Sequence, residues 1–284
     1  MVVSSDPLPI QPRRSVLRRT FRVLLNLVIG YVLVSLAVMI FQRRLIYFPT
    51  RLSPGEAEAL ASQEGYKTWR NQAGELIGWH LPAQGTTTSS VLVVHGNAGC
   101  ALDRDYLARP IHAAAAVDVY LLEYPGYGSR PGAPSQRTFL AAGEEAFSLL
   151  NPRQPIYLVS ESLGAGVTAH LAKMHPDRVS GLAFLVPYNN LVSVGQQQMP
   201  FLPVSILLWD RFDPAQWLND YRGPADFVIA EADQVIAPKL GRRLHDGYAG
   251  PKRLRVIPGA GHNDVAAQSA EWWQEVFSFW RDPR

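Results

Sequence analysis

The stretch IYLVSESLGAGVTA, residues 156–169, decides the fold of this chain. Its first four residues are apolar and typical of a buried β-strand, and its last six are mostly small and typical of the start of a helix. A strand that turns into a helix through small-x-Ser-x-Gly is strained, so the positions two before and two after the serine take small residues. Here those positions are Ser160 and Gly164, and the serine between them is Ser162.

This turn predicts the position of Ser162. We expect its hydroxyl at the C-terminal edge of a sheet, with the N-terminus of the following helix directed at it. That geometry serves acyl transfer. Ser160 stands where the pattern commonly has glycine, and a short Ser/Gly string also fits an ordinary strand–helix turn. The surrounding sequence therefore has to support the interpretation.

From residue 66 the chain alternates between strand-like and helix-like segments. Apolar runs that predict strands are separated by segments that predict helices, and continuous apolar strands of this kind favour a parallel sheet covered on both faces. We expect an α/β fold in one domain, with ligands bound at the C-terminal ends of the strands. The predicted strands are 66–70, 75–81, 91–94, 119–122, 156–159, 181–186, 227–230 and 254–257, and the predicted helices are 102–116, 135–150 and 265–280.

Composition and charge exclude several classes of protein. The 284 residues are 47% apolar and 18% charged, which is typical of a globular chain. Residues 1–51 carry a net charge of +7 and the remainder −4, so the basic character belongs to the N-terminal end and indicates no nucleic-acid surface on the domain. The single cysteine, Cys100, excludes an internal disulfide, and nothing in the sequence calls for a metal or an organic cofactor.

Residues 23–41 are 19 residues without a charge, flanked by arginines on both sides. As a helix they span roughly 30 Å, the thickness of the hydrocarbon core. A cleaved signal peptide and a buried helix are the competing interpretations. We favour an uncleaved single-pass anchor, because the apolar run continues past the poor cleavage site at 35–37 and no polar face interrupts it.

The distribution of arginines predicts the orientation of this anchor. Five arginines precede the span and three follow it closely. The positive-inside rule then places the N-terminus in the cytoplasm and the main domain on the other side. We expect a bacterial inner-membrane protein with a periplasmic domain.

A serine hydroxyl needs a base and an orienting acid to act as a nucleophile. Both follow Ser162 in the order Ser, Asp, His: Asp233 comes three residues after the predicted strand 227–230, and His262 lies in a glycine-containing loop after the last strand. Glu231 and Asp264 are rivals for the acid. Asp264 is only two residues from the histidine and is poorly placed to reach Nδ1.

The loop His95-Gly96-Asn97-Ala98-Gly99 directly follows the predicted strand 91–94. Its backbone N–H at Asn97, together with that of Leu163, predicts an oxyanion hole, whereas a plain glycine-rich turn is the alternative. We expect His95 to anchor the loop. The glycine-rich stretch 124–129 predicts a tight turn beneath the site; it lacks the lysine and spacing of a phosphate-binding loop.

Five motifs in order resemble those of the α/β-hydrolase superfamily across residues 66–280: HGNAG (95–99), YPGYGSRPGAPS (124–135), SESLG (160–164), EADQVIAP (231–238) and PGAGHND (258–264). The apolar segment followed by IYFP (46–49) is similar to membrane-anchored serine hydrolases of the serine aminopeptidase-like group, which includes acyl-protein thioesterases and lysophospholipid hydrolases. The resemblance implies Ser162 as nucleophile, Asp233 as acid, His262 as base, and the backbone amides of Asn97 and Leu163 as oxyanion donors.

The resemblance also implies a domain organisation. We expect a basic tail at 1–22, a transmembrane anchor at 23–41, a connecting segment at 42–65 and an α/β-hydrolase catalytic domain at 66–284.

The expected activity is hydrolysis of carboxylic esters or thioesters, with lipid-like acyl substrates, through a Ser-His-Asp triad and an acyl-enzyme. A serine peptidase of the same fold, a haloperoxidase- or lyase-like enzyme and a non-catalytic membrane-tethered scaffold stay open. Three roles stay open for the apolar run 199–209: it could line an acyl pocket, face the bilayer or pack as an ordinary core helix. The expected partners are the substrate and the bilayer, with no nucleic acid, and the sequence specifies no oligomeric state.

Overall fold

The computed structural model describes residues 13–265 and 267–283 and divides into two compact units, Met1–Gln42 and Arg43–Arg284. The described part of the first unit is helical and belongs to α1 (Arg13–Ile46). Residues 1–12 of the predicted basic tail lie outside the described residues, and residues 13–22 are helical.

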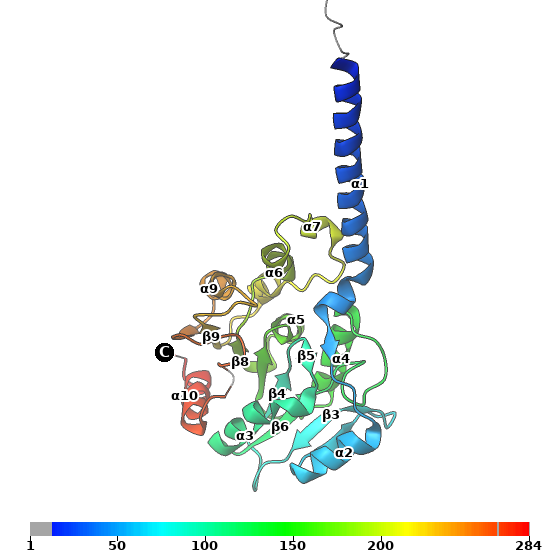
Figure 1. The fold of residues 1–284 in the computed structure, drawn as a ribbon. Coiled ribbons are helices and arrows are strands. Elements are labelled where there is room, and N and C mark those ends of the chain that lie inside the picture. The colour runs from blue at the N-terminus through cyan, green and yellow to red at the C-terminus, as the bar shows by residue number, and fades with distance from the viewer. Residues whose placement is uncertain (1–12, 266, 284) are drawn as a thin grey trace, which may run out of the picture. The chain divides into compact units, whose positions relative to one another are not determined.

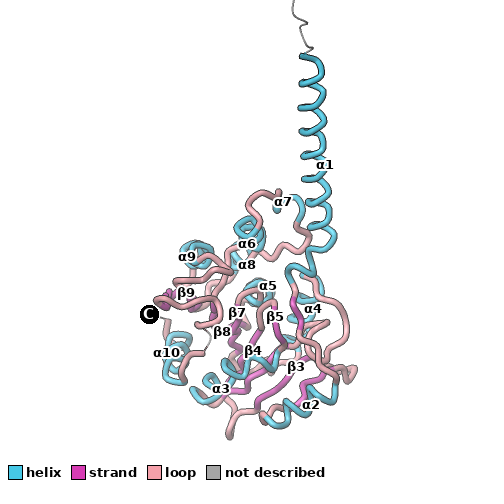
Figure 2. Tube along the Cα trace, in the orientation of Figure 1, coloured by secondary structure: helices cyan, strands magenta, loops and turns pink. Residues whose placement is uncertain are grey.

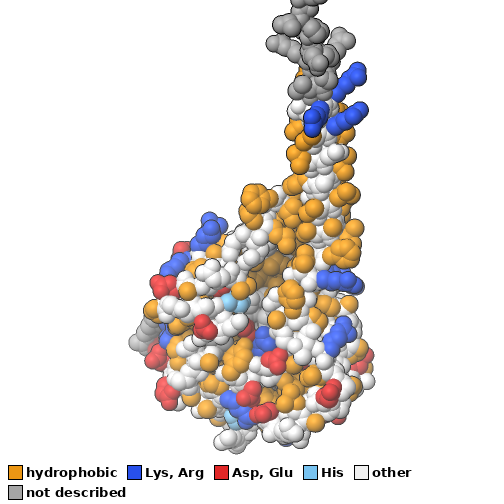
Figure 3. All heavy atoms as spheres, in the orientation of Figure 1, with side chains coloured by type: hydrophobic (Ala, Val, Ile, Leu, Met, Phe, Trp, Pro, Cys, Tyr) orange, Lys and Arg blue, Asp and Glu red, His pale blue; other side chains and the backbone are white. Residues whose placement is uncertain are grey.

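Helix α1 contains a stretch, Leu17–Ile46, that is long and apolar enough to cross a membrane, and the predicted anchor 23–41 lies within it. Its apolar side chains are exposed along the length of the helix, and Figure 3 shows them flanked by basic side chains. A helix that is apolar all round and not buried in protein is typical of a membrane span. The structure thus contains one N-terminal candidate for such a span among the described residues.

The second unit is built on an eight-stranded sheet in the order β10-β9-β8-β7-β4-β6-β3-β2. The strands from β10 to β6 run parallel, and β3 and β2 pair antiparallel at the end of the sheet (Figures 1 and 2). The expected mostly parallel sheet is confirmed. The strands are β2 (Lys67–Arg70), β3 (Leu76–Leu81), β4 (Ser89–Val94), β6 (Val117–Leu122), β7 (Ile156–Glu161), β8 (Val179–Leu185), β9 (Ala225–Ala230) and β10 (Lys252–Ile257).

Helices cover both faces of this sheet and bury a separate apolar core on each. Along β4, for example, Val91 and Val93 face one core whereas Leu92 and Val94 face the other, as strand alternation requires. The helices on the first face are α2 (Pro54–Gln63), α3 (Asp105–Ala114) and α10 (Ala270–Arg281), and those on the second are α4 (Gln136–Ser148), α5 (Gly164–Met174) and α9 (Pro238–Gly247).

Short elements complete the unit above the carboxyl ends of the strands. The chain between β8 and β9 forms a group of small helices instead of a separate domain. These are α6 (Leu191–Gln198), α7 (Val204–Leu207), α8 (Pro214–Trp217) and the 3₁₀-helix η2 (Leu218–Asp220); elsewhere a 3₁₀-helix η1 (Ala101–Arg104) precedes α3, and β1 (Phe48–Pro49) pairs with β5 (Ala98–Gly99).

The structure differs from the predicted elements at several places. The closing helix begins at Ala270 and not at 265, because the Ser269 hydroxyl accepts the N–H of Trp272 and caps it there. The segment predicted as one helix over 102–116 is divided into η1 and α3. In the expected connecting segment 42–65, for which no element was predicted, the structure has the end of α1, β1 and α2.

The cap of α4 gives a test of this fold. Ser135 accepts the N–H of Thr138 at 3.1 Å, so Ser135→Ala leaves a helix N–H unpaired. We expect the free energy of unfolding to fall by about 1 kcal/mol, measured by chemical denaturation of the full chain in detergent. The matched control is Ser148→Ala at the exposed other end of α4, where the hydroxyl only donates to the Glu145 carbonyl. An equal effect of both substitutions would contradict the assignment of the cap.

Candidate active site

Ser162 occupies the sharp turn between β7 and α5. Its φ of +51° is strained for a residue with a side chain, and the turn is held because its N–H donates to the Leu185 carbonyl at 2.9 Å. Gly164 allows the following helix to come close: a Cβ there would lie 2.5 Å from the carbonyl oxygen of Val94 and 2.8 Å from that of His95. The turn therefore has no room for a side chain at position 164.

Ser160, the departure from glycine in the motif, fits this turn. The residue is fully buried, and its hydroxyl lies 3.5 Å from the Ala183 carbonyl of the neighbouring strand β8. A serine side chain is thus accommodated between β7 and β8.

Ser162, His262 and Asp233 form one chain of hydrogen bonds. The Ser162 hydroxyl lies 3.1 Å from His262 Nε2, and His262 Nδ1 lies 2.7 Å from Asp233 Oδ2. A carboxylate accepts from Nδ1–H, which leaves Nε2 unprotonated and able to accept the serine proton. Both partners of this bond are shielded from solvent: 2% of the Asp233 side chain and 10% of the His262 side chain are exposed. The structure thus brings together the three side chains singled out in the sequence.

Asp233 is oriented by the turn that follows β9. Its second oxygen, Oδ1, accepts the backbone N–H groups of Val235 and Ile236, each at 2.8 Å. This leaves Oδ2 directed at His262. The carboxylate therefore cannot rotate away from the imidazole without losing two hydrogen bonds.

The two rival carboxylates bind the histidine loop instead of the histidine. Glu231 accepts the N–H of Gly259 at 3.1 Å, and Asp264 accepts the N–H of Gly261 at 2.7 Å. Both glycines belong to the loop that carries His262. Sequence reasoning considered these residues only as alternative acids and missed that they brace the loop.

The loop 95–99 lies against Ser162. A Cβ on Gly96 would be 3.3 Å from the Ser162 Cβ, which shows how closely the loop backbone approaches the nucleophile. Among the described residues, neither the Asn97 nor the Leu163 amide donates to another backbone group. Both predicted oxyanion donors are thus N–H groups without a backbone acceptor, on the two segments that meet at Ser162.

The segment that follows α1 binds the outer side of this loop, which the sequence did not reveal. Strand β1 pairs in parallel with β5, with Phe48 N–H donating to the Asn97 carbonyl and Thr50 N–H to the Gly99 carbonyl, both at 2.8 Å. The Asn97 side chain in turn donates to the Ile46 carbonyl at 2.9 Å. Residues 46–50 therefore hold the loop from one side, and we call them the strap.

Two tyrosines hold the same loop from beneath. Tyr127 donates its hydroxyl to the Asn97 carbonyl at 2.7 Å, and Tyr124 donates to the His95 carbonyl at 3.2 Å. Both rings are buried and belong to the glycine-rich stretch predicted to turn under the site. This stretch therefore supports the loop through its aromatic side chains.

His95 anchors the loop as a neutral imidazole. Its Nδ1–H donates to the Gly96 carbonyl at 2.9 Å, and burial lowers its pKa to about 3. Its Nε2 lies 3.5 Å from Oε1 of Glu123. Burial raises the pKa of the Glu123 carboxyl to about 8, so at neutral pH the protonated, neutral form predominates. The contact is a neutral acid–imidazole pair, since charging either group would be opposed by burial.

A buried ion pair supports the other side of the turn. Glu161, next to Ser162, accepts from Arg104 Nε at 3.1 Å and from the Tyr106 hydroxyl at 2.8 Å. The pKa of Arg104 is raised by the neighbouring Glu161 carboxylate, although desolvation opposes this shift. Arg104 also donates to the Cys100 carbonyl at 3.3 Å, so it links the turn to the end of the 95–100 loop. No pattern in the sequence pointed to this pair.

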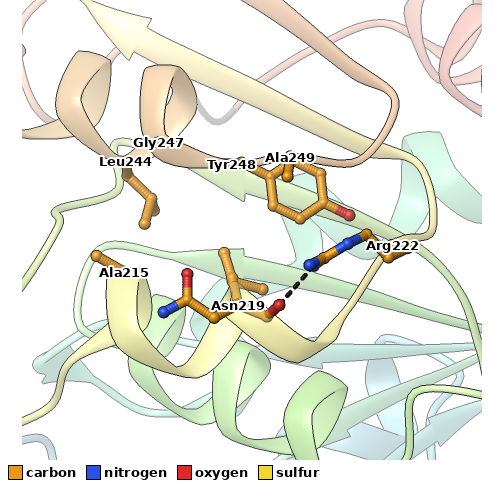
Figure 4. Close-up of a pocket in the computed structure, with 8 residues that line it drawn as sticks. Ala215, Asn219, Arg222, Leu244, Gly247, Tyr248 and Ala249 are labelled. Carbon is orange, nitrogen blue, oxygen red and sulfur yellow. Dashed lines mark hydrogen bonds between the residues drawn. The ribbon is translucent and has the colours of Figure 1, made fainter.

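The structure also contains a pocket of about 250 Å³ between η2 and the end of α9 (Figure 4). None of the predicted site residues lines it, and Arg222 there is bound to the Asn219 carbonyl. Its lining is Ala215, Leu218, Asn219, Arg222, Leu244, Gly247, Tyr248 and Ala249. The candidate chemistry therefore belongs to the Ser162 turn and not to this pocket.

The Glu123–His95 pair predicts a pH dependence of stability. The carboxyl pKa rises from 4.5 in the unfolded chain to about 8 in the folded chain, so the folded chain holds the proton more tightly and stability falls as pH rises between these values. Glu123→Gln has no such proton and stays neutral across this pH range. We expect the variant to gain stability relative to the wild type as pH rises from 5 to 8, in denaturant titrations at each pH. A constant difference across this range would contradict the neutral pair.

Comparison with known proteins agrees with this architecture. A family model described as alpha/beta hydrolase fold matches residues 89–205. The uncharacterized protein Rv2307c of Mycobacterium tuberculosis is 34% identical over 243 residues, covering 82% of this chain and 85% of that protein. The lysophosphatidylserine lipase ABHD12 of Macaca fascicularis is 25% identical over 209 residues, covering 65% of this chain and 51% of that protein.

The solved structures include an esterase of Pyrococcus furiosus, which superposes with a TM-score of 0.61 at 16% identity, over 84% of this chain and 98% of that one. Such a likeness reports the fold alone. Together with the family model and the sequence relatives, it identifies this chain as a member of the α/β-hydrolase superfamily.

Proposed function

We propose that this protein is a membrane-anchored serine hydrolase that cleaves carboxylic ester or thioester bonds of lipid-like acyl substrates. The observation that carries the proposal is the hydrogen-bonded chain from Ser162 through His262 to Asp233, at a strained turn that presents the hydroxyl beside loop 95–99. A merely structural serine would not require a shielded imidazole and a doubly anchored carboxylate aligned behind it.

The proposed reaction proceeds through an acyl-enzyme. The Ser162 oxygen attacks the acyl carbon while His262 Nε2 accepts its proton, and Asp233 stabilises the resulting imidazolium. The oxygen of the tetrahedral intermediate takes hydrogen bonds from the amides of Asn97 and Leu163. His262 then gives the proton to the leaving alcohol or thiol. Water, deprotonated by the same imidazole, attacks the acyl carbon and releases the acid, and Ser162 regains its proton.

The proposal of a lipid-like substrate is based on the sequence relatives and on the apolar helix α1. ABHD12 is a lysophosphatidylserine lipase by name, and a helix apolar enough to cross a membrane keeps the domain near acyl chains. We propose that residues 23–41 span the bacterial inner membrane with the N-terminus in the cytoplasm, and that the catalytic domain lies in the periplasm. In this layout the basic tail is 1–22 and the catalytic domain is 66–284, preceded by the connecting segment 42–65.

The triad is tested by active-site labelling. A fluorophosphonate probe is expected to label the wild type and not Ser162→Ala, because only an activated serine attacks it. The matched control is Ser278→Ala on the exposed side of α10, which should label normally. Labelling of Ser162→Ala would remove Ser162 from the nucleophile's role, and a wild type that resists labelling would favour the non-catalytic scaffold.

The assignment of the acid is tested by rate. Asp233→Asn is expected to lower kcat for a p-nitrophenyl ester by about 10⁴, because an amide in place of the carboxylate favours the wrong imidazole tautomer. Glu231→Gln and Asp264→Asn serve as controls, since these carboxylates contact only backbone N–H groups of the histidine loop. We expect both controls to retain far more activity. A larger loss in either control than in Asp233→Asn would reassign the acid.

The substrate class is tested by chain length. Across p-nitrophenyl esters from acetate to palmitate in mixed micelles, we expect kcat/KM to rise with acyl length, since each buried methylene contributes about 0.8 kcal/mol of binding. A preference for acetate would contradict the lipid-like substrate while leaving the hydrolase proposal intact. Cleavage of peptide substrates in preference to all esters would favour the serine peptidase.

A further inference from the structure

We infer that the segment Phe201–Trp209, which contains α7, is a second membrane-contact surface that seats the domain on the lipid bilayer. The inference rests on the proposed membrane anchoring by α1. It concerns residues outside the triad and the strap, and it adds a contact between the folded domain and the lipid to the single anchor.

The segment presents large apolar side chains to solvent. Phe201 is 86% exposed, Ile206 76% and Trp209 53%, and Figure 3 shows hydrophobic side chains gathered on the projecting α7 region. Soluble surfaces rarely group such side chains on one short segment, and those that do commonly contact another protein or a membrane.

This exposure is built into the local structure. Val204, between the exposed residues, is buried and packs on Gly195 of α6, where a Cβ would lie 2.8 Å from its side chain. Arg211 closes the segment at its other end by donating to the Leu208 carbonyl at 2.8 Å. The segment is thus anchored to the domain through Val204 and Arg211, while Ile206 is exposed. Its apolar surface therefore belongs to a supported segment of the fold.

A partly buried ion pair links the segment to Arg43 near the end of α1. Asp210, the residue after Trp209, accepts from Arg43 Nε at 3.2 Å and from the Tyr47 hydroxyl at 2.9 Å. Arg43 lies two residues after the uncharged stretch 23–41, so a helix that places this stretch in the hydrocarbon places Arg43 among the headgroups.

The link to Arg43 identifies the occupant as lipid. Trp209 precedes Asp210 in the chain, and Asp210 is paired with Arg43. If Arg43 lies among the headgroups, Trp209 lies near the headgroup layer, where tryptophan is a preferred side chain. Phe201 and Ile206, on the same short segment, then reach the boundary between headgroups and acyl chains. A protein partner at this surface would have to displace lipid that the anchor already brings there.

Hydrogen bonds from α6, which precedes the segment in the chain, reach the turn that follows Asp233. At the end of α6, Gln198 donates to the Val235 carbonyl at 2.8 Å and Gln197 accepts the Ala237 N–H at 3.0 Å, which joins the segment to the turn that holds Asp233. Val235 on that turn is itself 47% exposed.

The inference is tested by spin labels on single cysteines in the full chain, reconstituted in phosphatidylcholine–phosphatidylglycerol nanodiscs. The native Cys100 does not compete for the label, since it is buried and burial raises the pKa of its thiol to about 12. The label positions are Phe201→Cys and Ile206→Cys on the surface, Leu27→Cys on α1, and Met174→Cys as a matched control, 54% exposed at the far end of α5 from Ser162.

The readout is the collision rate of each label with a water-soluble nickel complex and with oxygen. We expect labels at 201, 206 and 27 to meet the nickel complex roughly fivefold less often than the label at 174, with the opposite trend for oxygen, because a polar complex is excluded from the apolar layer. Two surface positions guard against a variant that fails to fold.

The second surface would be overturned if the labels at 201 and 206 met the nickel complex as often as the label at 174 while the label at 27 stayed shielded. The anchor would then remain in place. Equal shielding at 174 would also overturn it, because the contact would then not be local to this segment. Nickel access at 27 would overturn both the anchor and the surface. The labels report position without turnover, so failure of the hydrolase proposal would show separately, in the fluorophosphonate experiment.

Discussion

The strained turn at Ser162 is the constraint on which the remaining structure depends. A residue with a side chain is held at φ +51° because its N–H is bonded to β8 and the helix that follows runs close to the backbone of residues 94–95. This close approach requires Gly164 and small residues around it, and it also sets the distance between the nucleophile and loop 95–99. The strained backbone of Ser162 therefore depends on the close packing of the Ser162 turn against the segment that leads into loop 95–99.

The loop next to Ser162 is fixed from several directions by groups far apart in sequence. The strap bonds its outer backbone, Tyr124 and Tyr127 bond its carbonyls from below, and the neutral pair of His95 and Glu123 fills the space beneath it. Preorganised amides are effective at an oxyanion because they need not reorganise during the reaction. A loop held at this many points is consistent with such preorganisation.

The strap connects the end of α1 to this loop. Ile46 is the last residue of α1, and its carbonyl accepts a hydrogen bond from Asn97, the residue whose amide is one of the predicted oxyanion donors. Four residues further on, Thr50 is still bonded to the same loop. Residues 46–50 thus carry backbone and side-chain hydrogen bonds to loop 95–99, and they belong to the second compact unit.

The sequence alone determined the α/β fold, the alternation of its elements, the Ser162 turn and the order of Ser162, Asp233 and His262, because these follow from local patterns and from the rule that parallel strands end at one edge. Only the tertiary structure decided what Glu231 and Asp264 do, that residues 46–50 pair with loop 95–99, and that Arg104 meets Glu161 beside the nucleophile. It also shows that the last helix begins at Ala270 and not at the predicted residue 265. Each of these contacts depends on the exact direction of a side chain or backbone group toward a distant partner, and spacing along the chain carries no information about that direction.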